Sequence, residues 1–250
     1  MNASLAVSTV IFALRSSGRF GADDRERALW LPLVRRIRAP YDGLWALPGG
    51  PLGDDEGLAE AATATLERTT GLAPRYLEQL YAFGDPQRSG ERGGATEAAR
   101  PAPGAAHTAT ERVVSVVYWT LVGDEEARAA RIGQNVRWFR ADELPKLAFD
   151  HNLIVEYALW RLRNKVEYSR IASAFLGETF TLAQLREVHE ALRGQSLDPA
   201  NFRRQIEASG ALVDTGEVLT GVRHRPPRLY RYNTTVDLAD QGPLGRAAQQ

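Results

Sequence analysis

The spacing of the apolar residues changes near Asp150, and this change most constrains what the chain can fold into. Before Asp150, the chain contains four runs rich in β-branched and aromatic residues, which are typical of strands. These runs lie at 5–14, 28–37, 112–122 and 135–139. After Asp150, apolar residues recur every three to four positions, as they do on one face of a helix. The sequence therefore predicts a strand-rich N-terminal domain and a helical C-terminal domain.

The C-terminal part carries the start signals of four helices. They begin at Asp150, Ser169, Thr181 and Asp198. Thr181 and Gln184 have the spacing of a capping box, in which each side chain bonds the backbone N–H of the other residue. Asp198 precedes Pro199, which suits the first helical position, and Gly210 is placed to close this last helix. Two strand-like runs follow at 211–215 and 228–232, and helices followed by such a hairpin indicate a winged helix-turn-helix domain.

Composition excludes several classes of function. The 31 Lys and Arg residues balance 31 Asp and Glu residues, which argues against a highly basic packaging protein. Cysteine is absent, so disulfides, thiolate nucleophiles and Cys-bound zinc are excluded. The apolar run 5–14 is shorter than the about 20 residues that cross a bilayer. We therefore expect a cytoplasmic protein without a membrane partner.

The segment 86–112 has no large apolar residue and is rich in glycine, proline and alanine. It cannot bury enough apolar surface to offset the entropy of ordering it. We predict a disordered insertion there, and a flexible tail at 237–250.

The segment 50–72 resembles the signature of the Nudix family. Gly50, Glu56, Leu66, Gly71 and Leu72 fall on the expected positions, after a strand-like segment and across a predicted helix. The alternative is a chance strand, turn and helix that ends in a glycine cap.

The residues that carry the chemistry of that family are replaced. The resemblance implies metal-binding glutamates at three positions, which here hold Thr65, Arg68 and Thr69. Magnesium prefers carboxylate oxygens, and Arg68 adds a positive charge where the cation would sit. We therefore predict no catalytic residue and no metal site, and we hypothesise that Arg68 neutralises a diphosphate in place of the cation.

Other carboxylates nearby do not clearly restore the site. Glu60 and Glu67 lie on the opposite face of the predicted helix, at 100° per residue, and are typical of a solvated surface. Asp54 and Asp55 in the preceding loop leave open a weak, non-standard metal site.

The helix that begins at Asp198 is the predicted DNA-reading element. Phe202 and Ile206 mark its buried side, and the predicted DNA contacts on its outer side are Ala200, Asn201, Arg203 and Arg204. Arg can bond guanine or phosphate, and Asn can bond adenine, in the major groove. An ordinary solvated helix face is an equally good interpretation of this helix alone.

The loop that follows supports the DNA-binding interpretation. Between Val218 and Tyr232 the chain has arginines but no acidic residue. We predict DNA contacts, to phosphates or the minor groove, from Arg223, His224, Arg225 and Arg228.

Taken together, these segments resemble the NrtR-type transcriptional regulators of NAD metabolism. The resemblance is carried by 50–72, 81–86, 147–151, 197–204 and 225–230. It implies an α+β chain, with a Nudix-like α/β/α sandwich on a mixed sheet followed by a winged helix-turn-helix. The implied domains are an effector-binding domain at 1–149, a linker helix at 150–166 and a DNA-binding domain at 167–236. It also implies a homodimer, a palindromic operator at genes of NAD synthesis or salvage, and ADP-ribose or a related nucleotide as effector, with no cofactor required.

The effector contacts are predicted in the N-terminal domain. Arg35, Arg36 and Arg38 would contact phosphates, and Trp45 and Phe83 would stack on adenine, although both aromatic residues also suit a core. The remaining predicted contacts are Gly49, Gly50 and Arg68. Leu153 and Tyr157 suit either the core or a dimer interface.

The sequence thus favours a repressor that senses an ADP-ribose-type metabolite without turning it over. One alternative is an active Nudix hydrolase, an ADP-ribose pyrophosphatase with an appended winged helix. Another is that the C-terminal domain binds proteins rather than DNA.

Overall fold

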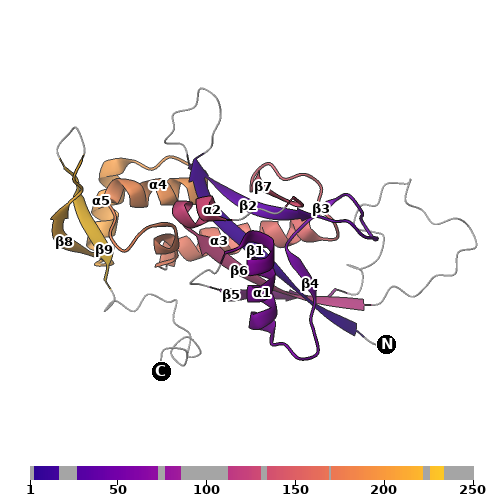
Figure 1. Cartoon of the computed structure of the whole chain (residues 1–250). Helices are drawn as coiled ribbons and strands as arrows, with labels where there is room; N and C mark the ends of the chain where they lie inside the picture. The colour runs from indigo at the N-terminus through magenta and orange to yellow at the C-terminus, as the bar shows by residue number, and fades with distance from the viewer. Residues whose placement is uncertain are drawn as a thin grey trace, which may run out of the picture. The chain divides into compact units, whose positions relative to one another are not determined.

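The computed structural model describes residues 3–16, 27–72, 77–85, 112–130, 134–168, 170–221 and 226–233 (Figure 1). The chain divides into two compact units. The sheet unit comprises Met1–Phe12, Trp30–Leu121 and Arg128–Ala158, and the helical unit comprises Ala13–Leu29, Val122–Ala127 and Leu159–Gln250. The predicted insertion lies outside the described residues except for Arg112, and the predicted tail lies wholly outside them.

Seven strands of the described residues form one sheet. They are β1 (Ala3–Ser16), β2 (Arg27–Arg35), β3 (Trp45–Ala46), β4 (Gly49–Pro51), β5 (Glu78–Phe83), β6 (Arg112–Val122) and β7 (Val136–Arg140). The order is β3-β2-β1-β6-β5, while β4 pairs with β1 and β7 pairs with β2. The central strands β1 and β6 are buried along most of their length, which explains their nearly continuous apolar sequences.

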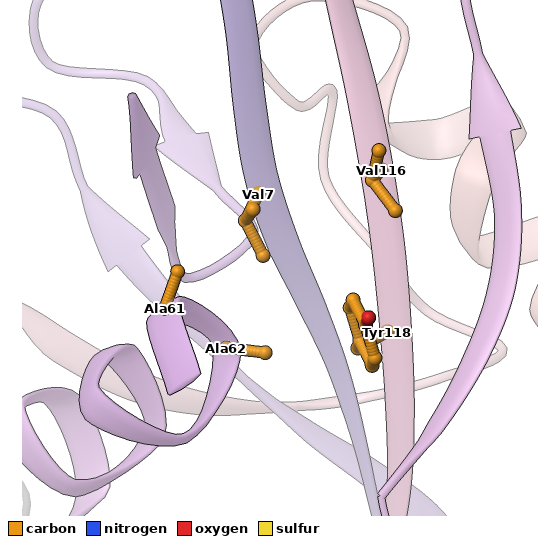
Figure 2. Close-up of a cluster of buried hydrophobic side chains, with 5 residues drawn as sticks. All are labelled: Val7, Ala61, Ala62, Val116 and Tyr118. Atoms are coloured by element: carbon orange, nitrogen blue, oxygen red, sulfur yellow. The ribbon is translucent and has the colours of Figure 1, made fainter. Parts of the chain in front are cut away.

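Helix α1 (Leu58–Thr70) packs against the sheet through small side chains. Ala61 and Ala62 face Val7 of β1 and Val116 and Tyr118 of β6 (Figure 2). Alanine brings the helix backbone close to the strands, so the N-terminal end of the helix is firmly seated. The helix ends at Gly71, whose φ of 67° is the left-handed conformation that glycine adopts without strain.

The remaining elements belong wholly or partly to the helical unit. They are α2 (Asp124–Ala129), α3 (His151–Tyr168), the 3₁₀ helix η2 (Arg170–Phe175), α4 (Leu182–Arg193), α5 (Pro199–Ala208), β8 (Leu212–Val218) and β9 (Arg228–Tyr232). Strands β8 and β9 form an antiparallel hairpin. The predicted α+β class, with a mixed-sheet Nudix-like part followed by a winged helix, is confirmed. None of the helices within the described ranges is long and apolar enough to cross a membrane.

Two of the predicted helix starts in the helical unit, at Thr181 and Asp198, are confirmed. The backbone N–H of Thr181 donates to Gln184 Oε1 at 2.8 Å, and the N–H of Gln184 donates to Thr181 Oγ1 at 3.2 Å. The N–H of Asn201 donates to Asp198 Oδ1 at 2.7 Å. All three bonds satisfy N–H groups that a helix cannot pair internally.

Gly210 closes the last helix as predicted: it follows the C-cap Ser209, and its φ of 66° is the left-handed conformation typical of that position. The helix expected from Ser169 differs in type, because the segment that buries Ile171, Ala172 and Phe175 is a 3₁₀ helix. The sequence also failed to indicate β5, because Leu80 is the only buried side chain of this terminal strand.

His189 of α4 gives a testable pH dependence. Its ring lies 5.3 Å from Phe202 of α5, and burial, followed by the charge of Arg193, lowers its pKa to about 4. This pKa lies below that of His189 in the unfolded chain. As the pH falls, His189 is therefore protonated in the unfolded chain before it is protonated in the folded protein. Stability should therefore be lost from about pH 6.5 down to about pH 4, by roughly 2 to 3 kcal/mol.

We expect the free energy of unfolding of His189→Gln to change less between pH 7 and pH 4.5 than that of wild type, because the variant lacks the imidazole. Urea unfolding of both proteins at pH 7 and pH 4.5 measures it. Equal pH dependence in the two proteins would contradict the assignment.

Candidate functional site

The sheet unit contains a cavity of about 400 Å³. Its walls include Ser8 of β1, Ser115 of β6, and Gly49 and Gly50 of β4. The hydroxyls of Ser8 and Ser115 lie 3.3 Å apart and share a hydrogen bond. This wall therefore offers small side chains, hydroxyl groups and a strand backbone that a ligand can approach closely.

Another part of the cavity lining is the segment that leads into α3. The backbone N–H of Leu47 donates to His151 Nδ1 at 2.9 Å. The N–H of Leu147 donates to Asn152 Oδ1 at 2.8 Å, and Asn152 Nδ2 donates to the carbonyl of Pro145 at 3.1 Å. These bonds fix the first turn of α3 beside the cavity.

Arg36 and Phe149 line the same cavity, and Tyr41 packs against Phe149. The guanidinium of Arg36 lies 4.7 Å from the ring centre of Phe149, and the ring of Tyr41 meets Phe149 edge-on at 4.8 Å. Arg36 Nε donates to the carbonyl of Pro40 at 2.9 Å. Burial lowers the pKa of Arg36 from its ordinary value, while the charges of Asp42 and Tyr41 oppose that shift.

Tyr41 and Phe149 both have an unusual backbone. Their φ values are 66° and 56°, in the left-handed region that costs energy for residues with a side chain. Such strain persists only where surrounding contacts hold it, and it clusters at ligand sites. Here the contacts of the two rings with each other and with Arg36 supply the support.

Of the predicted effector contacts, Arg36, Gly49 and Gly50 line the cavity. The other predicted residues lie elsewhere: Arg35, Arg38, Trp45, Arg68 and Phe83 are not among its lining residues. Trp45 packs edge-on against Phe139 at 5.0 Å, and Phe83 packs with Tyr81 and Tyr157 at 5.3 and 5.9 Å.

Sequence reasoning missed Phe149, His151, Ser8 and Ser115 as cavity residues. Phe149 and His151 stood within a segment that carried the family resemblance, 147–151, which was the available signal. The serines gave none, because each is a single polar residue inside an apolar strand.

Two carboxylates of the Nudix-like segment accept hydrogen bonds from nearby backbone N–H groups. Glu56 Oε1 accepts the N–H of Gly53 at 2.7 Å, and Glu60 Oε2 accepts the N–H of Gly57 at 2.9 Å. Thr65 is buried, and Arg68 Nη2 donates to its Oγ1 at 3.3 Å. Across the described ranges, no three His, Cys, Asp or Glu side chains gather as a metal site.

The second candidate surface is the outer face of α5. Ala200, Asn201, Arg203 and Arg204 are exposed, whereas Phe202 is buried against α4. Arg204 Nη2 donates to Asn201 Oδ1 at 2.7 Å, so the two polar side chains are already oriented together. This face is arranged as the helical pattern predicted.

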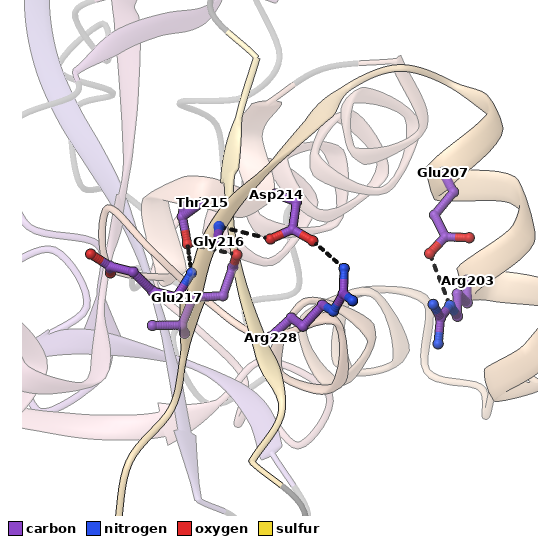
Figure 3. A network of polar contacts seen from close by, with 8 residues as sticks. Arg203, Glu207, Asp214, Thr215, Gly216, Glu217 and Arg228 are labelled. Carbon is purple, nitrogen blue, oxygen red and sulfur yellow. Dashed lines mark hydrogen bonds and ion pairs between the residues drawn. The ribbon is translucent and has the colours of Figure 1, made fainter.

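The predicted wing contacts are only partly visible. Arg223, His224 and Arg225 lie outside the described residues. Arg228 Nη1 lies 2.7 Å from Asp214 Oδ2 (Figure 3). The expectation that the arginines of this region face no opposing charge is therefore wrong for Arg228, because the hairpin brings Asp214 of β8 to it.

Comparison with protein families matches both units. The NUDIX domain model matches residues 15–158. The model described as the NrtR DNA-binding winged helix domain matches residues 172–232.

Individual relatives agree with these matches. A protein of Acinetobacter baylyi, named ADPR responsive transcriptional repressor NtrR, is 29% identical over 209 residues, which are 82% of this chain and 76% of its own length. The crystal structure of Shewanella oneidensis NrtR is 32% identical, with a TM-score of 0.68, over 92% of this chain and 94% of that one. Its complex with a 27mer DNA is 31% identical, with a TM-score of 0.66, over 92% and 93% of the two chains.

One relative carries an enzyme name. An ADP-ribose pyrophosphatase of Methanocaldococcus jannaschii is 30% identical over 130 residues, which are 52% of this chain and 66% of its own length.

The glycines of β4 give a matched pair of variants. A Cβ on Gly49 would lie 2.7 Å from the backbone oxygen of Val7, whereas a Cβ on Gly50 would have no atom within 4 Å. We expect Gly49→Ala to destabilise the protein by about 1 to 3 kcal/mol through overpacking. Gly50→Ala should stay within about 0.5 kcal/mol of wild type. Thermal unfolding measures both, and equal melting temperatures would contradict the packing described.

Proposed function

Because the chain belongs to the NrtR family of Nudix-related regulators, we propose that it is a DNA-binding transcriptional repressor that senses ADP-ribose or a related nucleotide. The observation that carries the proposal is the exposed, pre-oriented pair of Asn201 and Arg204 on α5. The DNA complex of the S. oneidensis relative and the name of the A. baylyi relative support it.

In this proposal α5 enters the major groove. Its N-terminal part carries the two side chains that suit base edges, since Arg bonds guanine and Asn bonds adenine. Ala200 shares this face and Arg203 flanks it, while Arg228 of β9 and Arg223, His224 and Arg225 of the wing are the further proposed contacts, to phosphates.

The effector is proposed to bind in the sheet-unit cavity. A volume of about 400 Å³ lies within the usual size of small-molecule sites. Arg36 supplies a charge for a phosphate, and the ring of Phe149 supplies an apolar surface for a base or ribose. The backbone of Gly49 and Gly50 and the hydroxyls of Ser8 and Ser115 supply polar contacts. Arg68 remains a further proposed phosphate contact, from outside the cavity lining.

We propose that the effector is bound without being hydrolysed. Thr65, Arg68 and Thr69 stand where Nudix chemistry needs carboxylates, and Glu56 and Glu60 bond backbone N–H groups instead. The competing candidate is an ADP-ribose pyrophosphatase, favoured by the similarity to the M. jannaschii enzyme.

The remaining parts of the proposal come from the family resemblance. They are a cytoplasmic homodimer, a palindromic operator at genes of NAD synthesis or salvage, and domains at 1–149, 150–166 and 167–236. Exposed apolar side chains in the sheet unit support the dimer: Tyr81 is 54% exposed and Leu153 of α3 is 56% exposed. The ring of Tyr81 lies 5.4 Å from that of Tyr157 of α3. Strand β5, which carries Tyr81, and helix α3, which carries Leu153, are therefore neighbours.

DNA binding is tested with the duplex upstream of the chain's own gene. We expect specific binding, a loss of roughly 10- to 100-fold in Arg204→Ala, and a change in affinity when ADP-ribose is added. Fluorescence anisotropy at moderate salt measures all three. Arg112→Ala, an exposed arginine of β6, is the matched control and should bind as wild type does. Absence of DNA binding, or unchanged binding by Arg204→Ala, would refute the repressor proposal.

The dimer is tested by charging the exposed apolar surface. We expect Leu153→Glu to convert the dimer to a monomer, because a buried carboxylate would lose its hydration. Glu156→Gln, on the same helix, should leave the dimer intact. Light scattering after size exclusion gives the masses. A monomeric wild type, or a dimeric Leu153→Glu, would exclude this interface.

A further inference from the structure

One ion pair lies on α5 and another lies in the hairpin (Figure 3). Arg203 Nε lies 2.8 Å from Glu207 Oε1 within α5. Arg228 Nη1 of β9 lies 2.7 Å from Asp214 Oδ2 of β8. Two of the proposed DNA-contacting arginines are therefore paired with carboxylates in the free protein.

The hairpin is built to hold Asp214 in place. Asp214 Oδ1 accepts the N–H of Gly216, whose φ is 78°, at 2.9 Å. Thr215 Oγ1 donates to the carbonyl of Leu229 at 2.9 Å and accepts the N–H of Glu217 at 3.2 Å. The strand register shifts between Asp214 and Val218, so this irregular segment is fixed by its own side chains.

The surroundings of Asp214 and Arg228 favour the charged form of both residues. The N–H of Gly216 and then the side chain of Arg228 hold the pKa of Asp214 below its ordinary value. Asp214, followed by smaller contributions that include Glu207, raises the pKa of Arg228. Glu207 of α5 is thus close enough to act on the hairpin arginine as well as on Arg203.

These pairs contribute little to folding. Exposed ion pairs add little to stability because water and salt screen them, and the two arginine side chains are 63% and 66% exposed. What matters about the two pairs is that their arginines are proposed DNA contacts. Carboxylates beside a surface that meets phosphates repel DNA, and an arginine already neutralised by one releases fewer counterions when DNA binds.

We propose that Glu207 and Asp214 are specificity-determining residues, which hold Arg203 and Arg228 and disfavour phosphate contacts with DNA of arbitrary sequence. This inference rests on the proposed DNA-binding function. When α5 binds in the major groove of the operator, the phosphates lie where each arginine can contact a phosphate in place of its carboxylate. DNA that does not seat α5 meets a surface whose charges cancel.

The experiment compares Glu207→Gln and Asp214→Asn with wild type. Affinity is measured for the upstream duplex and for a scrambled duplex of equal length, from 50 to 300 mM salt. We expect each variant to bind the scrambled duplex at least roughly threefold more tightly, and log affinity to fall more steeply with log salt by about 0.9 for one added phosphate contact. The ratio of upstream to scrambled affinity should fall.

Two controls separate this effect from a general change of charge. Glu217→Gln removes a carboxylate from the same strand, and within the described residues Glu217 has no arginine partner, so it should leave the ratio unchanged. Adding Arg228→Gln to Asp214→Asn should abolish the gain on scrambled DNA.

An unchanged ratio in both variants, or an equal fall in Glu217→Gln, would overturn the inference while leaving the repressor proposal standing. A wild type that binds neither duplex would overturn both.

Discussion

The hydrogen bond from the N–H of Leu47 to His151 Nδ1 is the contact on which the candidate effector site depends. It joins the loop between β3 and β4 to the first turn of α3, and both segments line the cavity. The same helix continues to Tyr168, well into the helical unit. A ligand that contacts His151 therefore touches the first turn of a helix whose later turns belong to the helical unit.

The Nudix-like segment is a scaffold whose carboxylates have structural partners. Ala61 and Ala62 seat α1 on the sheet, and Glu56 and Glu60 bond the turns before it. Positions that would hold a metal carry Thr65, Arg68 and Thr69 instead. Without carboxylates at these positions, the segment lacks the oxygen ligands that a divalent cation would need, which supports the proposal of binding without hydrolysis.

The sequence predicted the parts of the fold that have strong local signals. The capping box at Thr181, the cap at Asp198 and the outer face of α5 all follow from side chains close together in the chain. The short strands β3 and β4 gave no periodicity to detect. The cavity was only partly predicted: Arg36 was identified, but Ser8 and Ser115 meet only because β1 and β6 lie side by side. The pairing of Arg228 with Asp214 likewise depends on hairpin register, which residue spacing does not reveal.

Binding of ADP-ribose without turnover is tested by observing the ligand directly. ADP-ribose is titrated into the full chain by calorimetry with magnesium present, and the recovered solution is analysed for AMP and ribose 5-phosphate by chromatography. We expect saturable binding, with ADP-ribose recovered intact. Release of AMP at a rate that rises with magnesium concentration would contradict binding without turnover.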